Sequence, residues 1–175
     1  MPKPSPLIPT PTPRTQQLIE QLQLQPHPEG GWYREVFRSQ GQVLPQDGRP
    51  ARSALTSIYF LLEAARHSRW HRVLSDEVWV HLEGAALDLW TWDAADSRLH
   101  QAALGPVGAA SAPQHVVAAG LWQAARPQAG DAAGYTLVAC MVGPGFDFSD
   151  FSMMERGGME AQKIAADHPQ LASLI

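Results

Sequence analysis

The feature that most limits the fold of this chain is a series of short apolar or alternating runs between Arg34 and Val142. Glycine, proline, aspartate and serine interrupt these runs roughly every 8–12 residues, a spacing typical of antiparallel sandwiches and barrels. No alternation of strand and helix suggests a parallel sheet. The sequence therefore predicts an all-β fold with these strands: REVFRS, SALTSIYFLL, SRWHRV, EVWVHL, ALDLWTW, SRLHQAAL, QHVVAAG, LWQAAR and YTLVACMV.

The two ends of the chain differ from this pattern. Six prolines among the first thirteen residues predict an extended, mobile tail over residues 1–13. The whole chain of 175 residues is 45% hydrophobic, which is enough apolar material for one core. The chain is too short for two ordinary domains. We therefore expect a single domain over 14–175.

Two short helices are expected to flank the strands. The spacing of Leu18, Ile19 and Leu22 predicts an N-terminal helix that Thr15 caps. Residues 155–175 have near-helical apolar spacing with a break at a proline, and they are expected to cap one end of the barrel.

Composition argues against several classes of partner. The net charge is -4 and the 13 basic residues are scattered, so no basic field for nucleic acid is expected. Cys140 is the only cysteine and lies in an apolar run, which excludes an internal disulfide. With no signal-peptide pattern and no membrane-spanning run, the sequence favours a soluble cytoplasmic protein with no membrane partner.

Titratable groups concentrate in WHRVLSDEVWVHLEG, residues 70–84. Since alternate residues of a strand share a face, Arg69 and His71 point one way, and Glu77, Trp79 and His81 share a face of the next strand. Burying such groups is costly unless they pair, bind a ligand or hold a metal. This stretch is therefore the candidate site.

The same stretch resembles the first motif of the cupin superfamily, G-x5-H-x-H-x(3,4)-E-x6-G. Arg69, His71, Glu77 and Gly84 occupy successive positions, although the gap between His71 and Glu77 is one residue too long. In the second motif, P-x-G-x2-H, Gln123 stands where a histidine is usual. Two of the four usual metal ligands are thus replaced, by Arg69 and Gln123.

A closer resemblance is to the cupin 5, or DUF985, family of small cupins. It is carried by HPEGGWYREVFRS, LTSIYFLLEAARHSRWHRVLSDEVWVHLEGAALDLW, AAGLWQAARP and YTLVACMVGPGFDFSDFSMM, which run in order from His27 to Met154. The resemblance implies a double-stranded β-helix, or jelly-roll barrel, paired as a homodimer. It implies no particular reaction, because members of the family share none that is established.

The resemblance to cupins also raises the question of a metal, since many cupins hold one with three histidines and a glutamate. Here His71 and Glu77 are good ligands, whereas Gln123 is a weak one and Arg69 repels cations. We therefore predict no cofactor. A divalent transition metal at His71 and Glu77 stays an alternative.

Without a metal, the same residues predict acid–base chemistry. A hydrogen bond from Glu77 would fix the tautomer of His71, which could act as a general base, and Arg69 could hold an anionic group of the substrate. This arrangement resembles the sugar-nucleotide epimerases among the cupins, in which a tyrosine returns the proton. Tyr33, Tyr59 and Tyr135 are candidates for that acid, and the sequence selects none of them.

We therefore expect a cavity for a small polar or carbohydrate-like molecule. Arg69, Trp79, Gln123, Tyr33 and Tyr59 are its candidate binding residues, and His71 and Glu77 its catalytic pair. The aromatic residues could equally be barrel core, and His71 with Glu77 could be a buried pair that only fixes strand register. A non-catalytic binding or sensing protein and a metal-dependent enzyme remain alternatives.

Two further stretches bear on this cavity. In HPEGGWYREVFRS, Gly30 and Gly31 permit positive φ or a close backbone approach, and Glu29, Tyr33 and Arg34 could reach across the barrel mouth. In GPGFDFSDF, residues 143–151, phenylalanine alternates with aspartate, which predicts a segment that closes over the barrel.

Overall fold

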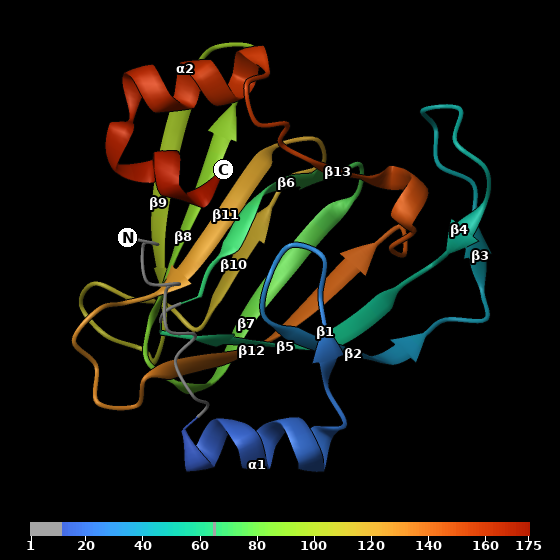
Figure 1. The fold of residues 1–175 in the computed structure, drawn as a ribbon. Helices are drawn as coiled ribbons and strands as arrows, with labels where there is room; N and C mark the ends of the chain where they lie inside the picture. Colours follow the sequence, from blue (N-terminus) through green and yellow to red (C-terminus); the bar gives the residue numbers. More distant parts are fainter. Residues whose placement is uncertain (1–11, 65) are drawn as a thin grey trace, which may run out of the picture.

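The computed structural model describes residues 12–64 and 66–175. Over these residues the strands form two main antiparallel sheets and a two-stranded ribbon (Figure 1). The first sheet has six strands in the order β1-β2-β5-β12-β7-β10, the second has five in the order β13-β6-β11-β8-β9, and β3 pairs with β4 in the ribbon. The predicted all-β fold with a short helix near each end is confirmed.

The nine runs predicted from the turn spacing correspond in order to β2 and to the eight strands β5–β12, and the second run also includes Ser53 of β4. The short strands β1, β3, β4 and β13 were not expected. The bounds are β1 (Gln25–Pro26), β2 (Trp32–Arg38), β3 (Gln42–Val43), β4 (Arg52–Ser53), β5 (Thr56–Glu63), β6 (Ser68–Val73), β7 (Asp76–Gly84), β8 (Leu87–Asp93), β9 (Arg98–Leu104), β10 (Gln114–Val117), β11 (Trp122–Pro127), β12 (Tyr135–Gly143) and β13 (Phe151–Met153).

The N-terminal helix α1 spans Pro13–Leu22. The expectation that Thr15 caps it is wrong: Thr12 is the N-cap, and its hydroxyl accepts a hydrogen bond of 3.2 Å from the Thr15 backbone N–H. Pro13 fits the first helical position because its missing N–H would have no partner there. The prediction of an extended tail over residues 1–13 is wrong at Pro13, which is helical, and residues 1–11 lie outside the described residues.

Helix α1 packs against the six-stranded sheet. Leu18 of the helix and Leu24, just after it, are buried with Leu61, Tyr135 and Leu137 from strands β5 and β12. Residues on either side of Leu61 belong to the cluster between the two sheets, so Leu61 and α1 lie on the outer face.

The C-terminal segment forms α2 (Met159–Asp167) and the 3-10 helix η2 (Pro169–Leu174), with the predicted break at Pro169. It does not cap a barrel end as expected. Instead, its apolar side chains are buried against four tryptophans of the five-stranded sheet (Figure 1). The four are Trp70, Trp90, Trp92 and Trp122. In β8, Trp90 and Trp92 alternate with Leu89, which points into the interior, so these tryptophans lie on the outer face. The C-terminal segment therefore covers that outer face.

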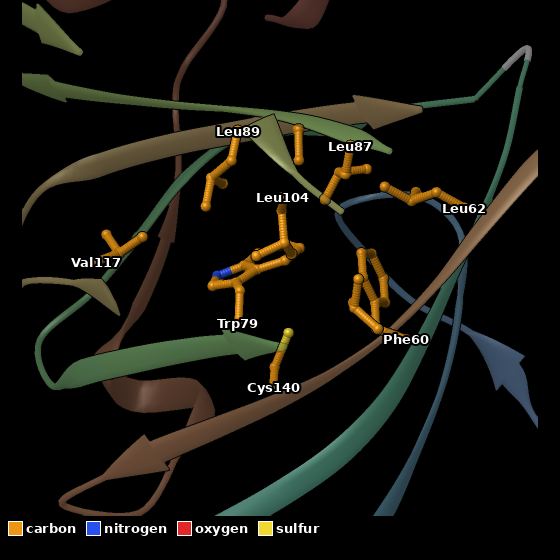
Figure 2. Close-up of a cluster of buried hydrophobic side chains, with 10 residues drawn as sticks. Phe60, Leu62, Trp79, Leu87, Leu89, Leu104, Val117 and Cys140 are labelled. Atoms are coloured by element: carbon orange, nitrogen blue, oxygen red, sulfur yellow. The ribbon is translucent and has the colours of Figure 1, made fainter. Parts of the chain in front are cut away.

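The main core lies between the sheets. Leu87, Leu89 and Leu104 of the five-stranded sheet meet Phe60 and Trp79 of the six-stranded sheet (Figure 2). All five are at most 1% exposed, so this part of the barrel is filled. No described helix has the length and apolar character to cross a membrane.

Candidate functional site

The rest of the barrel interior is a cavity of about 310 Å³. Its walls come from β1, β2, β5, β6, β7 and β12, from the turn after β1, and from residues 146–151. Phe60 and Cys140 belong both to the core cluster and to the cavity wall, so they form the boundary between the filled and the hollow part. This volume is near the lower end for small-molecule sites, which begin at about 300 Å³.

A tight turn between β1 and β2 carries two of the titratable groups that line the cavity, His27 and Glu29. The turn needs glycine: Gly30 and Gly31 have φ of 116° and 68°, and a Cβ on Gly31 would lie 2.6 Å from the carbonyl oxygen of Leu61. The predicted role of these glycines is confirmed. The backbone approach places the Glu29 carboxyl inside the barrel, where it is 5% exposed.

His71 is the central residue of the site and is 2% exposed. Its Nδ1 lies 2.7 Å from the carbonyl oxygen of Arg69, which can only accept, so Nδ1 carries a hydrogen and donates it. Its Nε2 lies 3.2 Å from Oε2 of Glu29. The other oxygen of Glu29 accepts a hydrogen bond of 2.9 Å from Ser68.

A proton on either His71 Nε2 or Glu29 Oε2 would remove the repulsion between the lone pairs of these two atoms. If it is on the carboxyl, both groups are neutral; if it is on the imidazole, they form an ion pair. Burial raises the pKa of Glu29 to about 8, against the smaller opposing effects of the Ser68 hydrogen bond and Arg69. Burial also lowers the pKa of His71. The neutral form with Glu29 as donor is thus favoured in the empty cavity.

Glu77, on β7, is the second buried carboxyl, and it has a different partner. Its Oε2 accepts a hydrogen bond of 2.7 Å from Nε2 of Gln123, whose Oε1 accepts one of 3.1 Å from the Trp79 indole. Burial raises the pKa of Glu77, and the nearby Glu29 adds to the effect while His71 opposes it. Burial and the adjacent Glu77 also raise the pKa of the Cys140 thiol, which makes it a poor nucleophile.

The expected direct hydrogen bond between His71 and Glu77 is replaced by two separate pairs. His71 pairs with Glu29 and Glu77 pairs with Gln123. The two pairs still face one cavity, because His71, Glu29 and Glu77 all line it. The strand periodicity of β6 and β7 predicted correctly that His71 and Glu77 point into the same interior. Glu29 comes from a turn about forty residues earlier, and the sequence predicted only that it could reach the barrel mouth.

His27 is a site residue that the sequence analysis missed. Its Nδ1 accepts a hydrogen bond of 3.3 Å from the Glu29 backbone N–H, and its ring packs edge-on against Tyr33 with centroids 4.5 Å apart. Burial, followed by the charge on His71, lowers the pKa of His27 to about 4. The available signal was the alternation in His-Pro-Glu just before two glycines.

Residues 146–151, for which the sequence predicts a segment that closes over the barrel, line one side of the cavity. They contain the 3-10 helix η1 (Phe148–Asp150). Asp150, 4% exposed, holds this segment to the ribbon, since it accepts hydrogen bonds of 2.8 Å from both Arg49 and Arg52. The rings of Phe146, Phe148 and Phe151 face one another at 5.0–6.1 Å and line the cavity.

The other candidate binding residues occupy different places. Among the three candidate tyrosines, Tyr33 lines the cavity, whereas Tyr59 and Tyr135 pack with helix α1 on the outer side. The Arg69 side chain turns outward to the carbonyl oxygen of Pro28, at 3.4 Å, and lines a surface hollow instead. It reaches neither the cavity nor an anion inside it.

Trp79 and Gln123 lie behind the cavity. Trp79 is 1% exposed and fills the core in Figure 2, and Gln123, also 1% exposed, connects it to Glu77. Their direct role is to fix the position of Glu77.

The residues present do not fit the metal centre that the resemblance to cupins implies. Within residues 12–64 and 66–175, no three His, Cys, Asp or Glu side chains are grouped to hold a metal ion. The donor set explains this: Glu77 is bonded to Gln123, and His71 Nε2 faces the carboxyl of Glu29.

Two antiparallel sheets that enclose a core and a cavity define a cupin-type barrel, and comparisons with known proteins agree. Chains of Bacillus subtilis oxalate decarboxylase share the fold at TM-scores of 0.53–0.54, with 14–15% identity, 86–87% of this chain covered and 37% of theirs. The family model described as Cupin superfamily (DUF985) matches residues 16–154. The chain therefore belongs to the cupin 5 (DUF985) family.

Two solved structures are more similar to it. A hypothetical protein from Leishmania major is 34% identical with a TM-score of 0.77, over 91% of this chain and 95% of that one. A protein from Shewanella oneidensis is 32% identical with a TM-score of 0.73, over 90% and 92%. A search of curated proteins finds no match. The family and fold expected from the sequence are confirmed, and neither relative supplies an activity.

Proposed function

We propose that the cavity binds a small polar molecule and that His71 moves a proton on it, as in an epimerase or isomerase. The observation that carries this proposal is the fixed tautomer of His71. Its Nδ1–H is held by the Arg69 carbonyl, so the lone pair of the neutral ring lies on Nε2, beside Glu29 and the cavity. A buried base of this kind is suited to proton abstraction next to a carbonyl group.

In the proposed reaction, a substrate displaces the Glu29 contact from Nε2, and His71 takes a proton from a carbon next to a carbonyl. Glu29, which has its own proton in the empty site, then donates to the oxygen on which negative charge develops. Tyr33 is the candidate for returning a proton to the opposite face, because it is the tyrosine among the three candidates that lines the cavity. The largely apolar walls exclude water from these transfers.

A non-catalytic binding protein is the second candidate. It is favoured by one observation: Nε2 of His71 already has a partner in Glu29, so the pair is satisfied without a substrate. In that case the same cavity would hold a ligand unchanged, and Glu29 and His71 would provide hydrogen bonds only.

The experiment has two stages. A panel of sugars, polyols, amines and hydroxy acids is screened for binding by thermal shift, and each binder is then incubated with the protein in deuterium oxide. An enzyme of this class incorporates deuterium from solvent into the ligand, and His71→Gln loses at least about 100-fold of that rate while binding persists. His100→Gln, an exposed histidine on β9, is the matched control. Binding without exchange would leave the second candidate.

A further inference from the structure

The charges that line the cavity are unbalanced. Four carboxyl groups line it, from Glu29, Glu35, Glu77 and Asp147, and among the described lining residues one cation does, Arg38. That guanidinium is already paired, because it donates to both oxygens of Glu35 at 2.9 and 2.7 Å and to the Phe146 carbonyl at 3.1 Å. Arg38 therefore offers little attraction to a further anion.

Among the described residues, no arginine or lysine makes an ion pair with Glu77 or Glu29, and Glu29 meets only the more distant charge of Arg69. Glu29 pairs with Ser68 and with the neutral form of His71, and Glu77 pairs with the amide of Gln123 and lies beside the weakly acidic thiol of Cys140. Glu77 is 7% exposed, so water does little to replace a counterion. A buried carboxyl that faces a hollow without a counterion is a natural position for a cationic ligand.

Burial raises the pKa of both Glu29 and Glu77 in the empty site. A positive charge placed beside Glu77 would reverse that effect there, since it stabilises the ionised carboxylate.

Aromatic rings form the other walls. Tyr33, Phe60, Phe146, Phe148 and Phe151 all line the cavity. The three phenylalanines of the closing segment are in mutual contact, and Phe151 also lies 5.5 Å from the His71 ring. Aromatic faces attract cations, quaternary ammonium groups above all, and they repel anions.

We infer that the ligand of this cavity is a small organic cation, an amine or quaternary ammonium compound, with its charge between Glu77 and the aromatic wall. This inference takes its location from the proposed function and adds the chemical class. It departs from the expectation that Arg69 would hold an anionic substrate, since that side chain lies outside the cavity. The cavity of about 310 Å³ limits the ligand to a small molecule.

The test uses probes that differ mainly in charge. Choline is compared with its neutral isostere 3,3-dimethylbutan-1-ol, and butylammonium with butan-1-ol and butyrate, by titration calorimetry on the full chain. We expect each cation to bind at least about tenfold more tightly than its neutral counterpart and butyrate to bind more weakly still.

Variants locate the effect. Glu77→Gln is expected to reduce the preference for cations about tenfold or more, and Glu155→Gln, an exposed carboxyl outside the cavity, to leave it unchanged. Phe148→Leu is expected to weaken the binding of choline more than the binding of its neutral isostere. Because the Phe148 ring is 54% exposed, the substitution leaves no cavity in the core.

Equal binding of cations and neutral isosteres, tighter binding of butyrate, or no cation binding up to about 10 mM would each overturn the inference. The proposed function would survive any of these results if a neutral or anionic compound from the screen exchanged hydrogen in a His71-dependent way. It would fail by itself if cations bound selectively but no binder exchanged hydrogen.

Discussion

At the scale of single residues, the site is a set of buried groups whose neutral forms are favoured by burial. His71 lies beside Glu29, Glu77 is held by Gln123, and burial lowers the pKa of His27. Each of these states follows from removing the group from water without giving it a counterion. The chemistry of the site therefore depends on what a ligand adds to it.

The first prediction concerns Glu29. Its folded pKa, about 8, lies above its ordinary value of 4.5, so the folded state binds a proton that the unfolded chain lacks between these values, and stability falls as pH rises through that window. Glu29→Gln mimics the neutral carboxyl, because its amide can donate to His71. Between pH 6.5 and 8 we expect the free energy of unfolding to fall in the wild type, and to fall by about 1–2 kcal/mol less in the variant.

Urea denaturation at pH 5.5, 6.5 and 8 measures this difference. The comparison is made above pH 6.5 because His27 has the opposite effect on stability at lower pH. Its pKa is lowered from 6.5 to about 4, so its contribution to stability rises with pH between these values. Parallel pH profiles of variant and wild type above pH 6.5 would show that Glu29 is ionised in the folded protein.

At the scale of elements, two connecting segments make the cavity out of an otherwise ordinary barrel. The turn between β1 and β2 brings His27 and Glu29 inward, and residues 146–151 line one side of the cavity. Both are irregular, and both are fixed by specific contacts, a close backbone approach in the first and a buried ionic cluster in the second. The strands alone would leave His71 and Glu77 at an open end.

The turn can be tested with Gly31→Ala. The substitution combines positive φ with a Cβ that would lie 2.6 Å from the Leu61 carbonyl oxygen, so we expect it to cost about 3 kcal/mol or more. Gly48→Ala is the control, because Gly48 has a φ of 86° but open space around it, and should cost only about 1–2 kcal/mol. Chemical denaturation measures both. Equal costs would mean that the turn tolerates a shift away from β5.

The closing segment can be tested with Asp150→Asn. Asp150 is buried and pairs with two arginines that are themselves 10–12% exposed, so removing its charge should cost about 2–4 kcal/mol. Hydrogen exchange of residues 146–153 should become faster than in the wild type.

Asp47→Asn is the control for this substitution, since Asp47 pairs with the same Arg49 but is half exposed; its cost should stay below about 1 kcal/mol. Unchanged exchange in the Asp150 variant would show that other contacts hold the segment.

At the scale of the whole molecule, each sheet has one face on the interior and one that needs another cover. The outer face of the five-stranded sheet is covered by α2 and η2, and part of the outer face of the six-stranded sheet by α1. Two apolar side chains are exposed on β7 and β10 of that sheet: Val116 and Leu82 are 51% and 45% exposed, and Val116 pairs with Val78. The family resemblance implies a homodimer, for which this face is a suitable surface.

We therefore predict that Val116→Lys weakens self-association at least tenfold, because it places a charge in the apolar patch. Val107→Lys, at a loop valine that is 85% exposed, should leave it unchanged. Sedimentation velocity over a range of concentrations measures the effect. A monomeric wild type at about 100 µM, or equal effects of the two variants, would contradict the prediction.

By itself, the sequence determined the all-β class, the extents of the longer strands and the shared interior face of His71 and Glu77. Strand periodicity and turn residues are local properties, and the spacing within β6 and β7 is enough to assign their faces. The family resemblance then supplied the barrel topology, which periodicity does not specify.

Only the tertiary structure decided which groups meet. Glu29 reaches His71 because a glycine turn approaches β5, Arg69 turns outward because the strand reaches the barrel rim there, and Tyr33 rather than Tyr59 faces the cavity. These contacts join segments far apart in the chain, and no local pattern encodes their distances. The charge and the chemistry of the site are therefore properties of the folded barrel, where burial and the choice of partner set the protonation of each group.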